Sequence, residues 1–229
     1  MGFSAYTSIT PTAVLSGTER ATLVRRTYGL VLLSIAVTVL GVAFGFTQPA
    51  LLNAVIAHPF ITFLAMFAPL MMAMRAQRVF PQNIILTLLF AFVEGVWLAP
   101  IMLVYDRVQP GVVGQAGLLT FSTFAVLSLY ATFSRRDFSA WGGFFITGLW
   151  VLIATSLLNM FFHNATAALW ISGATVFVFS GLLVFDTWRI MRSGQYTQDD
   201  YVAAAVQIYL DLLNLFLAIL SLLGGRDRR

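Results

Sequence analysis

Long apolar runs alternate with short polar segments along the chain, and the runs have the length that a membrane crossing requires. A transmembrane helix needs about 20 consecutive residues that are mostly apolar. Seven runs meet this requirement, so the pattern predicts an all-α membrane protein with a seven-helix bundle. The predicted spans are residues 28–46, 52–74, 84–105, 112–133, 141–162, 167–190 and 202–223, with Pro100 as a candidate break in the third.

The two ends of the chain are polar, which predicts one membrane domain between two tails. Residues 1–27 contain Ser, Thr and Pro and end in three arginines, so we expect a flexible cytosolic N-terminal tail. No signal peptide fits there, because the first apolar run begins too late and lacks a small-residue cleavage site. Residues 28–225 form the predicted transmembrane domain and residues 226–229 the C-terminal tail.

Arginine residues predict the orientation of the bundle. Cytoplasmic segments carry an excess of basic residues, and nine arginines lie inside if the N-terminus is cytosolic. In that arrangement the loops on the outer side contain Arg107. Arg226, Arg228 and Arg229 in the C-terminal tail oppose it, unless the last helix is re-entrant and returns the tail to the cytosol. The balance favours a cytosolic N-terminus.

Composition agrees with a membrane protein and excludes several kinds of site. Of the 229 residues, 59% are hydrophobic and 10% are charged, whereas a soluble domain carries roughly a quarter charged residues. The chain has no cysteine for a disulfide and no lysine for a Schiff base with retinal. Its scattered arginines form no nucleic-acid-binding patch. Because no phosphate-binding glycine loop is present, we expect no tightly bound cofactor.

Three acidic side chains, Glu94, Asp186 and Asp211, fall inside predicted spans. A carboxylate at the centre of a bilayer is costly, so such residues normally face the bundle interior and find partners. At 1.5 Å per residue, Asp211 lies roughly 14 Å along its helix from the cytosolic side, and Glu94 lies at a similar depth. These acids are therefore candidates for function, and the alternative is that they only fix helix packing.

The last span carries a polar stripe, which predicts that the other helices enclose it. Five positions with spacing i, i+4, i+7, i+11 and i+14 share one helical face, while the other faces are apolar. A polar stripe must face protein or water rather than lipid, so we expect the last helix to be central. The stripe comprises Gln207, Asp211, Asn214, Ala218 and Ser221, and a weaker one on the third span comprises Asn83, Thr87, Ala91 and Glu94.

Asp186 and Asp211 are candidates for a proton sensor that gates an ion route. If their carboxyl groups meet, both cannot ionise easily, so the pair would share a proton and titrate as a unit. Arg75, which closes the second span, would favour the charged pair when near and the protonated pair when it moves away. Deprotonated carboxylates attract a hard cation, so both aspartates are also candidate Ca²⁺ ligands. The residues expected to line the route are Glu94, Gln207 and Asn214.

Four segments resemble the Bax-inhibitor-like transmembrane family. Two of them, GLLVFDTWRI (residues 181–190) and IYLDLLNLFLAILSLLGG (residues 208–225), carry the two aspartates. The others are FVEGVWLAPIMLVY (residues 92–105) and SRRDFSAWGGFF (residues 134–145). The resemblance covers the chain from residue 28 onward, and the motifs that contain the aspartates make it specific.

The resemblance implies a seven-helix fold with an enclosed last helix and a pH-sensitive Ca²⁺ leak. The aspartate pair that senses protons and latches the gate in that family matches Asp186 and Asp211, and the arginine that partners this pair matches Arg75. Glu94 occupies a family position that holds Glu or a small residue. Leu64 stands where one branch of the family carries an acid, so cation entry is expected to differ here.

The resemblance also implies a location and partners. Bacterial relatives occupy the inner membrane, and some bind a membrane-embedded AAA protease, whereas eukaryotic relatives are linked to suppression of cell death. The short tail and the use of arginine alone favour a bacterial member. We therefore expect an integral inner-membrane protein that meets lipid, Ca²⁺ and protons, with the protease as a candidate partner.

Two other function classes are left open by the residues. A non-transporting modulator of a membrane protease or stress response would use the buried acids only for packing. An intramembrane aspartyl protease would use two aspartates on successive helices to activate water. The sequence opposes the protease, because Asp211 follows Ile-Tyr-Leu rather than Gly-x-Gly. We expect the protein not to be an enzyme.

Two local motifs predict packing and capping. Gly41 and Gly45 form a GxxxG pair, which is typical of a close contact between helices. Thr197 followed by Asp200 resembles a capping box that opens the last helix, with Asp in place of the usual Glu.

Overall fold

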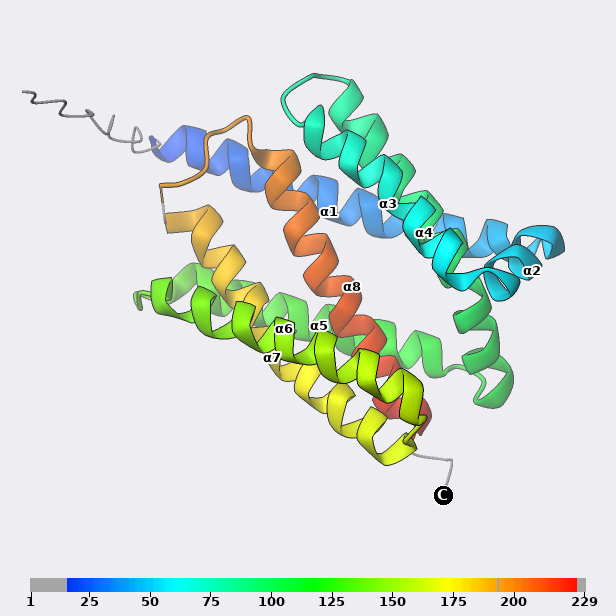
Figure 1. Cartoon of the computed structure of the whole chain (residues 1–229). Helices are drawn as coiled ribbons and strands as arrows, with labels where there is room; N and C mark the ends of the chain where they lie inside the picture. Colours follow the sequence, from blue (N-terminus) through cyan, green and yellow to red (C-terminus); the bar gives the residue numbers. More distant parts are fainter. Residues whose placement is uncertain (1–15, 193, 226–229) are drawn as a thin grey trace, which may run out of the picture.

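The computed structural model describes residues 16–192 and 194–225, and within these ranges the chain forms α-helices and no strand (Figure 1). The predicted C-terminal tail, residues 226–229, lies outside the described residues, as does most of the predicted N-terminal tail. The helices are α1 (Gly17–Phe46), α2 (Pro49–Ala57), α3 (Pro59–Arg75), α4 (Gln82–Val108), α5 (Val112–Phe133), α6 (Ser139–Phe162), α7 (Ala165–Arg192) and α8 (Tyr201–Gly225).

Six of the described helices, α1 and α4 to α8, are long and apolar enough to cross a membrane. The short helices α2 and α3 pass the same test only together, and they meet at an angle of 110°. The sequence predicted one span over residues 52–74, and the structure breaks it at His58. The ring of a proline disfavours the helical conformation of the residue before it. Pro59 follows His58 directly, so the break falls at His58. By contrast, α4 continues through Pro100.

The first helix begins at Gly17, ahead of the boundary that the sequence predicted at residue 28. Ser16 and Glu19 form a capping box there. The Ser16 side chain accepts a hydrogen bond from the Glu19 backbone N–H at 3.3 Å, and the Glu19 carboxylate accepts one from the Ser16 N–H at 2.9 Å. Because these bonds satisfy N–H groups at the helix start, residues 17–27 are helical rather than part of a flexible tail.

The last helix makes contacts with much of the bundle. It packs against α1, α4, α5 and α7. In Figure 1 it runs between one group formed by α1, α3 and α4 and a second group formed by α5, α6 and α7. Its buried side chains belong to both main hydrophobic clusters, with Ile208 in one and Leu215 in the other. The described helices are thus joined into one bundle largely through α8.

The two ends of the bundle differ in arginine content. Contacts such as Arg26 over the ring of Tyr201 and Arg78 with Asp200 show that α1, α4 and α8 begin at the same end. We call this end the arginine-rich end, because most described arginines lie there, whereas Arg107 lies in the last turn of α4 at the other end. The arginines of this end are Arg20, Arg25, Arg26, Arg75, Arg78, Arg135, Arg136, Arg189 and Arg192.

The backbones of α1 and α4 approach each other closely. A Cβ atom on Gly41 would overlap the backbone of Phe92, and one on Gly95 would overlap the carbonyl oxygen of Thr38. One turn further along, a Cβ atom on Gly45 would lie 2.6 Å from that of Ala99. Small residues allow backbones to approach in this way, so the close contact predicted from the GxxxG pair is confirmed.

Replacing Gly95 with alanine is expected to destabilise the protein. Alanine normally favours a helix by about 1 kcal/mol over glycine, but here its Cβ would overlap the backbone of Thr38. We expect a net loss of about 1–3 kcal/mol, measured as a lower thermal unfolding temperature in detergent. Gly143→Ala on α6, where a Cβ meets open space, is the matched control and should be neutral or stabilising. Equal effects of the two substitutions would contradict the close contact.

Candidate functional site

Asp186 on α7 and Asp211 on α8 face each other inside the bundle. The two residues are 9% and 6% exposed, and their carboxyl groups are close enough to interact with each other. In the described part of the chain, Oδ2 of Asp211 has no hydrogen-bond donor. Two buried carboxyl groups this close cannot both carry charge without a large cost, so the arrangement suits one shared proton. The structure therefore brings together the two aspartates on which the sequence hypothesis rests.

The polar stripe of α8 faces protein, as its spacing predicted. Beyond Asp211, the hydroxyl of Ser221 accepts a hydrogen bond from Ser172 on α7 at 2.9 Å. At the other end of the stripe, Oε1 of Gln207 accepts a hydrogen bond of 2.5 Å from the hydroxyl of Tyr196, in the connection between α7 and α8. The stripe thus lies against α7 and the segment that follows it.

Glu94 on α4 is separate from the aspartate pair. Its side chain is 4% exposed and lies within hydrogen-bonding reach of Tyr209, whose hydroxyl is 2.7 Å from that of Thr38 on α1. Successive residues turn by about 100° around a helix, so Tyr209 and Asp211 point to different sides of α8. The structure therefore places Glu94 in a second buried polar cluster, with two hydroxyl groups that the sequence did not indicate.

Asn214, the remaining residue predicted to line the ion route, bonds within its own helix. Its Nδ2 atom donates to the carbonyl oxygen of Leu210 at 2.8 Å, and its side chain is half-buried. Of the three residues predicted for the route, Gln207 is the one that the structure links to the segment beside the aspartate pair.

The arginine beside the aspartate pair in this structure is Arg189. It follows Asp186 by three residues on α7, which places the two side chains on one helical face, and its charge acts on the Asp186 carboxyl. Its Nε atom donates to Gln195 at 2.7 Å, and its guanidinium carbon lies 5.3 Å from the ring centre of Tyr196. Arg75 is exposed at the end of α3, and among the described residues it has no hydrogen-bond or ion-pair partner.

The aspartate pair offers few ligands to a metal ion. In residues 16–192 and 194–225, no group of three or more His, Cys, Asp or Glu side chains could hold one. Ca²⁺ takes about six to eight oxygen ligands. A cation held by Asp186 and Asp211 would therefore depend on water or backbone oxygens for most of its ligands.

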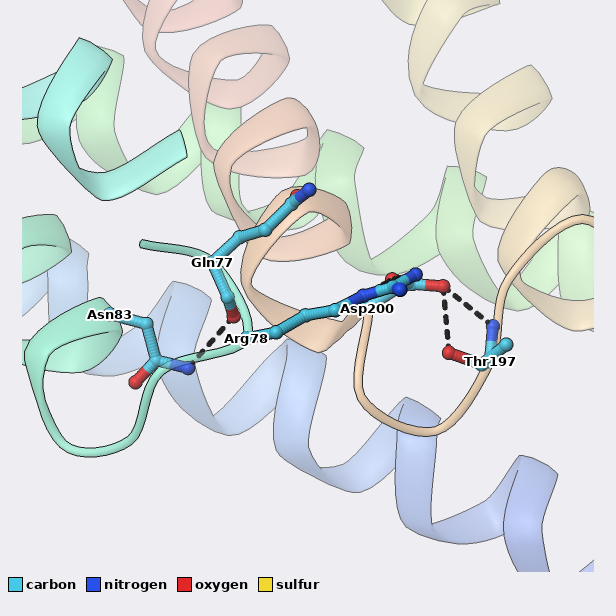
Figure 2. Close-up of polar contacts among 5 residues, drawn as sticks. All are labelled: Gln77, Arg78, Asn83, Thr197 and Asp200. Atoms are coloured by element: carbon cyan, nitrogen blue, oxygen red, sulfur yellow. Dashed lines mark hydrogen bonds and ion pairs between the residues drawn. The ribbon is translucent and has the colours of Figure 1, made fainter. Parts of the chain in front are cut away.

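An ion pair anchors the connection between α7 and α8 at the arginine-rich end (Figure 2). Nη2 of Arg78 lies 2.8 Å from Oδ1 of Asp200, and the other carboxylate oxygen accepts hydrogen bonds from the N–H and hydroxyl of Thr197 at 2.9 and 2.8 Å. Nearby, Asn83 donates to the carbonyl oxygen of Gln77 at 2.9 Å. Asp200 thus accepts a hydrogen bond from the Thr197 N–H at the start of α8, and its ion pair with Arg78 links α8 to the α3–α4 connection.

The protein family described as "inhibitor of apoptosis-promoting Bax1" matches residues 20–228, which include α4, α7 and α8 with all three buried acids. The chain belongs to this family. Membership in the Bax1-inhibitor family confirms the resemblance seen in the four sequence segments.

Three relatives match this chain over most of their length. The Golgi anti-apoptotic protein of vaccinia virus (strain Lister) is 32% identical over 213 residues, which are 92% of this chain and 88% of the relative. Bax inhibitor 1 of Schizosaccharomyces pombe is 29% identical over 223 residues, 96% of this chain and 82% of the relative. An uncharacterised protein of Campylobacter jejuni is 31% identical over 217 residues, 92% and 91% respectively, which supports a bacterial-type member.

The contribution of Asp200 to stability is expected to depend on pH. Partial burial raises the pKa of Asp200, but hydrogen bonds from Thr197 and the Arg78 guanidinium outweigh it and hold the pKa below its usual range. This contribution is present above the pKa of the unfolded state and is lost as the pH falls through the lower folded-state pKa. Asp200→Asn should therefore cost about 0.5–1 kcal/mol at neutral pH, measured by denaturant unfolding in detergent.

As the pH falls through the folded-state pKa of Asp200, the difference between Asp200→Asn and wild type should shrink, because the carboxylate becomes protonated and both side chains are then neutral. Asp199→Asn, at the exposed neighbouring residue, is the matched control and should change little at either pH. A cost for Asp200→Asn that is the same at both pH values would contradict the electrostatic origin.

Proposed function

We propose that this member of the Bax1-inhibitor family is a pH-sensitive cation leak for Ca²⁺, gated by a proton held between Asp186 and Asp211. The observation that carries the proposal is the buried, face-to-face pair on the adjacent helices α7 and α8. Acidic groups at membrane depth are costly and commonly mark ion or proton pathways. Passage would follow the ion gradient, and no enzymatic step or bound cofactor belongs to the proposal.

The leak requires a membrane-spanning bundle with its last helix enclosed. We take the bent pair α2–α3 as one broken span, which with the six long helices gives seven. The contacts of α8 with α1, α4, α5 and α7 support a central position for it. Because cytoplasmic segments are rich in basic residues, the arginine-rich end is proposed to face the cytosol, with the protein in the bacterial inner membrane.

The proton would control how α7 packs against α8. With one proton shared, a hydrogen bond between Asp186 and Asp211 joins the two helices, whereas without it two like charges repel at close range. The positive charge of Arg189 would reduce this repulsion from one side. These two states differ by one proton, so pH biases the packing of the helices. In this proposal the buried pair with its shared proton belongs to the closed state of the route.

Partners beyond the membrane and the transported ions are a separate part of the proposal. A lipid bilayer is the environment of the apolar helices. Two relatives are named for anti-apoptotic action or inhibition of Bax, and in a bacterial cell a membrane-embedded AAA protease is the partner that the family resemblance suggests. Regulation of such a protease is compatible with a leak, since it needs only the surface of the bundle.

Asp211→Asn is expected to flatten the pH dependence of Ca²⁺ entry into liposomes. Asparagine has the same shape but exchanges no proton, so the pair can no longer titrate as a unit. The rate of entry should change by about tenfold between pH 5 and pH 8 for wild type, followed with a Ca²⁺ dye inside the liposomes, and little for the variant. Asp137→Asn, at an exposed acid between α5 and α6, should keep the wild-type profile. Equal leaks with identical pH profiles for wild type and Asp211→Asn would refute the sensor.

A comparison of two arginines tests which one acts on the pair. Arg189→Gln removes a positive charge close to Asp186, so the midpoint of the liposome pH profile should move upward by about half a unit or more. Arg75→Gln is expected to leave the profile unchanged, because Arg75 is exposed at the end of α3 in this structure. A shift caused by Arg75→Gln alone would instead show that Arg75 reaches the pair in another state, as the sequence predicted.

A further inference from the structure

A cavity of about 540 Å³ lies at the arginine-rich end, between α1, α4 and the first turn of α8. It does not include the aspartate pair and has no part in the proposed leak. Its walls combine two guanidinium groups with apolar side chains. The lining residues that matter below are Arg26, Gly29, Leu33, Arg78, Phe80 and Tyr201.

Three side chains offer hydrogen-bond donors to this cavity. Arg26 lies with its guanidinium carbon 5.6 Å from the ring centre of Tyr201, an arrangement that orders the charged group. Arg78 uses Nε and Nη2 for Asp200, at 3.2 and 2.8 Å, and keeps further N–H donors. The hydroxyl of Tyr201 accepts a hydrogen bond from Asn83 at 3.2 Å, and among the described residues its own proton meets no acceptor. Two arginines with several N–H donors between them suit the oxygens of a phosphate.

Part of the remaining wall is apolar and is formed by side chains that include Leu33 and Phe80. Leu33 is 47% exposed and Phe80 is 74% exposed, so both would contact acyl chains in a membrane. Beside Arg26, a Cβ atom added to Gly29 would meet nothing within 4 Å, which leaves room next to the guanidinium group. The cavity therefore joins a cationic region to an apolar surface at the end of the membrane helices.

We infer that this cavity binds the head group of an anionic glycerophospholipid. The phosphate diester would contact Arg26, Arg78 and Tyr201, while the acyl chains lie along Leu33 and Phe80. Basic pockets between membrane helices favour anionic head groups in this way. A free phosphate ion would satisfy the same donors, but it would leave the apolar wall without a partner. A lipid would contact both the arginines and the apolar side chains, so it fits the cavity better.

One carboxylate opposes an anion in this position. Asp199 lines the cavity and is exposed, and it is distinct from Asp200, which is already paired with Arg78. Its negative charge should weaken the affinity for a phosphate without abolishing it, because water screens exposed charges. Neutralising Asp199 should therefore strengthen lipid binding. This substitution tests the inference through an increase in affinity rather than a loss.

The test is native mass spectrometry of the full chain in detergent, with phosphatidylglycerol or phosphatidylcholine of identical acyl chains. Wild type should retain phosphatidylglycerol in clear preference. Arg26→Gln should reduce its retention by about fivefold and Asp199→Asn should increase it by a similar factor. Gly29→Leu should reduce it by filling the cavity while every charge is kept. Arg107→Gln, at the other end of α4, and Gly143→Leu, on α6, are the matched controls and should behave as wild type.

Several outcomes would overturn the lipid site. One is equal retention of the two lipids, and another is unchanged retention in both Arg26→Gln and Gly29→Leu. If millimolar inorganic phosphate displaces phosphatidylglycerol, and Gly29→Leu retains phosphatidylglycerol as wild type does, the cavity is a site for a free anion instead. Circular dichroism checks that each variant is folded. If Arg26→Gln does not fold, the opposite effects expected for Gly29→Leu and Asp199→Asn still decide the matter.

Discussion

A carboxyl group buried in a membrane bundle must find a partner, and this requirement shapes the centre of the protein. Three acids are buried in the described part of the chain, and α8 supplies a partner to each cluster. Asp211 meets Asp186 of α7 on one side of α8, whereas Tyr209 meets Glu94 of α4 on another. Two residues of one helix turn thus tie α8 to two different neighbours, and the apolar side chains between them fill the remaining faces.

The small residues of α1 and α4 serve the second of these clusters as well as the packing. Gly95 directly follows Glu94, and it touches the backbone of α1 beside Thr38. The same close approach carries the hydroxyl of Thr38 to within 2.7 Å of Tyr209, which in turn reaches Glu94. A bulkier residue at Gly95 would separate α1 from α4. The polar contact among Thr38, Tyr209 and Glu94 therefore depends on a glycine that takes no direct part in it.

Periodicity in the sequence shows which face of a helix is polar, but it does not show which neighbour that face will meet. The spacing of the stripe on α8 was sufficient to predict that Asp211 is buried and faces protein. It gave no sign that Tyr209, an ordinary aromatic residue in an apolar span, would partner Glu94. The position of Arg75 depends on where α3 ends, and α3 follows a 110° bend at His58 that the apolar run concealed. Contacts that depend on such long-range packing cannot be predicted from the periodicity of a single sequence.

The connection between α7 and α8 makes the aspartate pair and the arginine-rich end parts of one unit. On leaving α7, the chain places Tyr196 against Gln207 of α8, with Arg189 over its ring. It then reaches Asp200, which Arg78 holds from the α3–α4 connection. Any movement that separates the helices at the aspartates must therefore disturb these contacts or be limited by them. Because the segment between α7 and α8 is short, few contacts link the buried carboxyl groups to that end of the bundle.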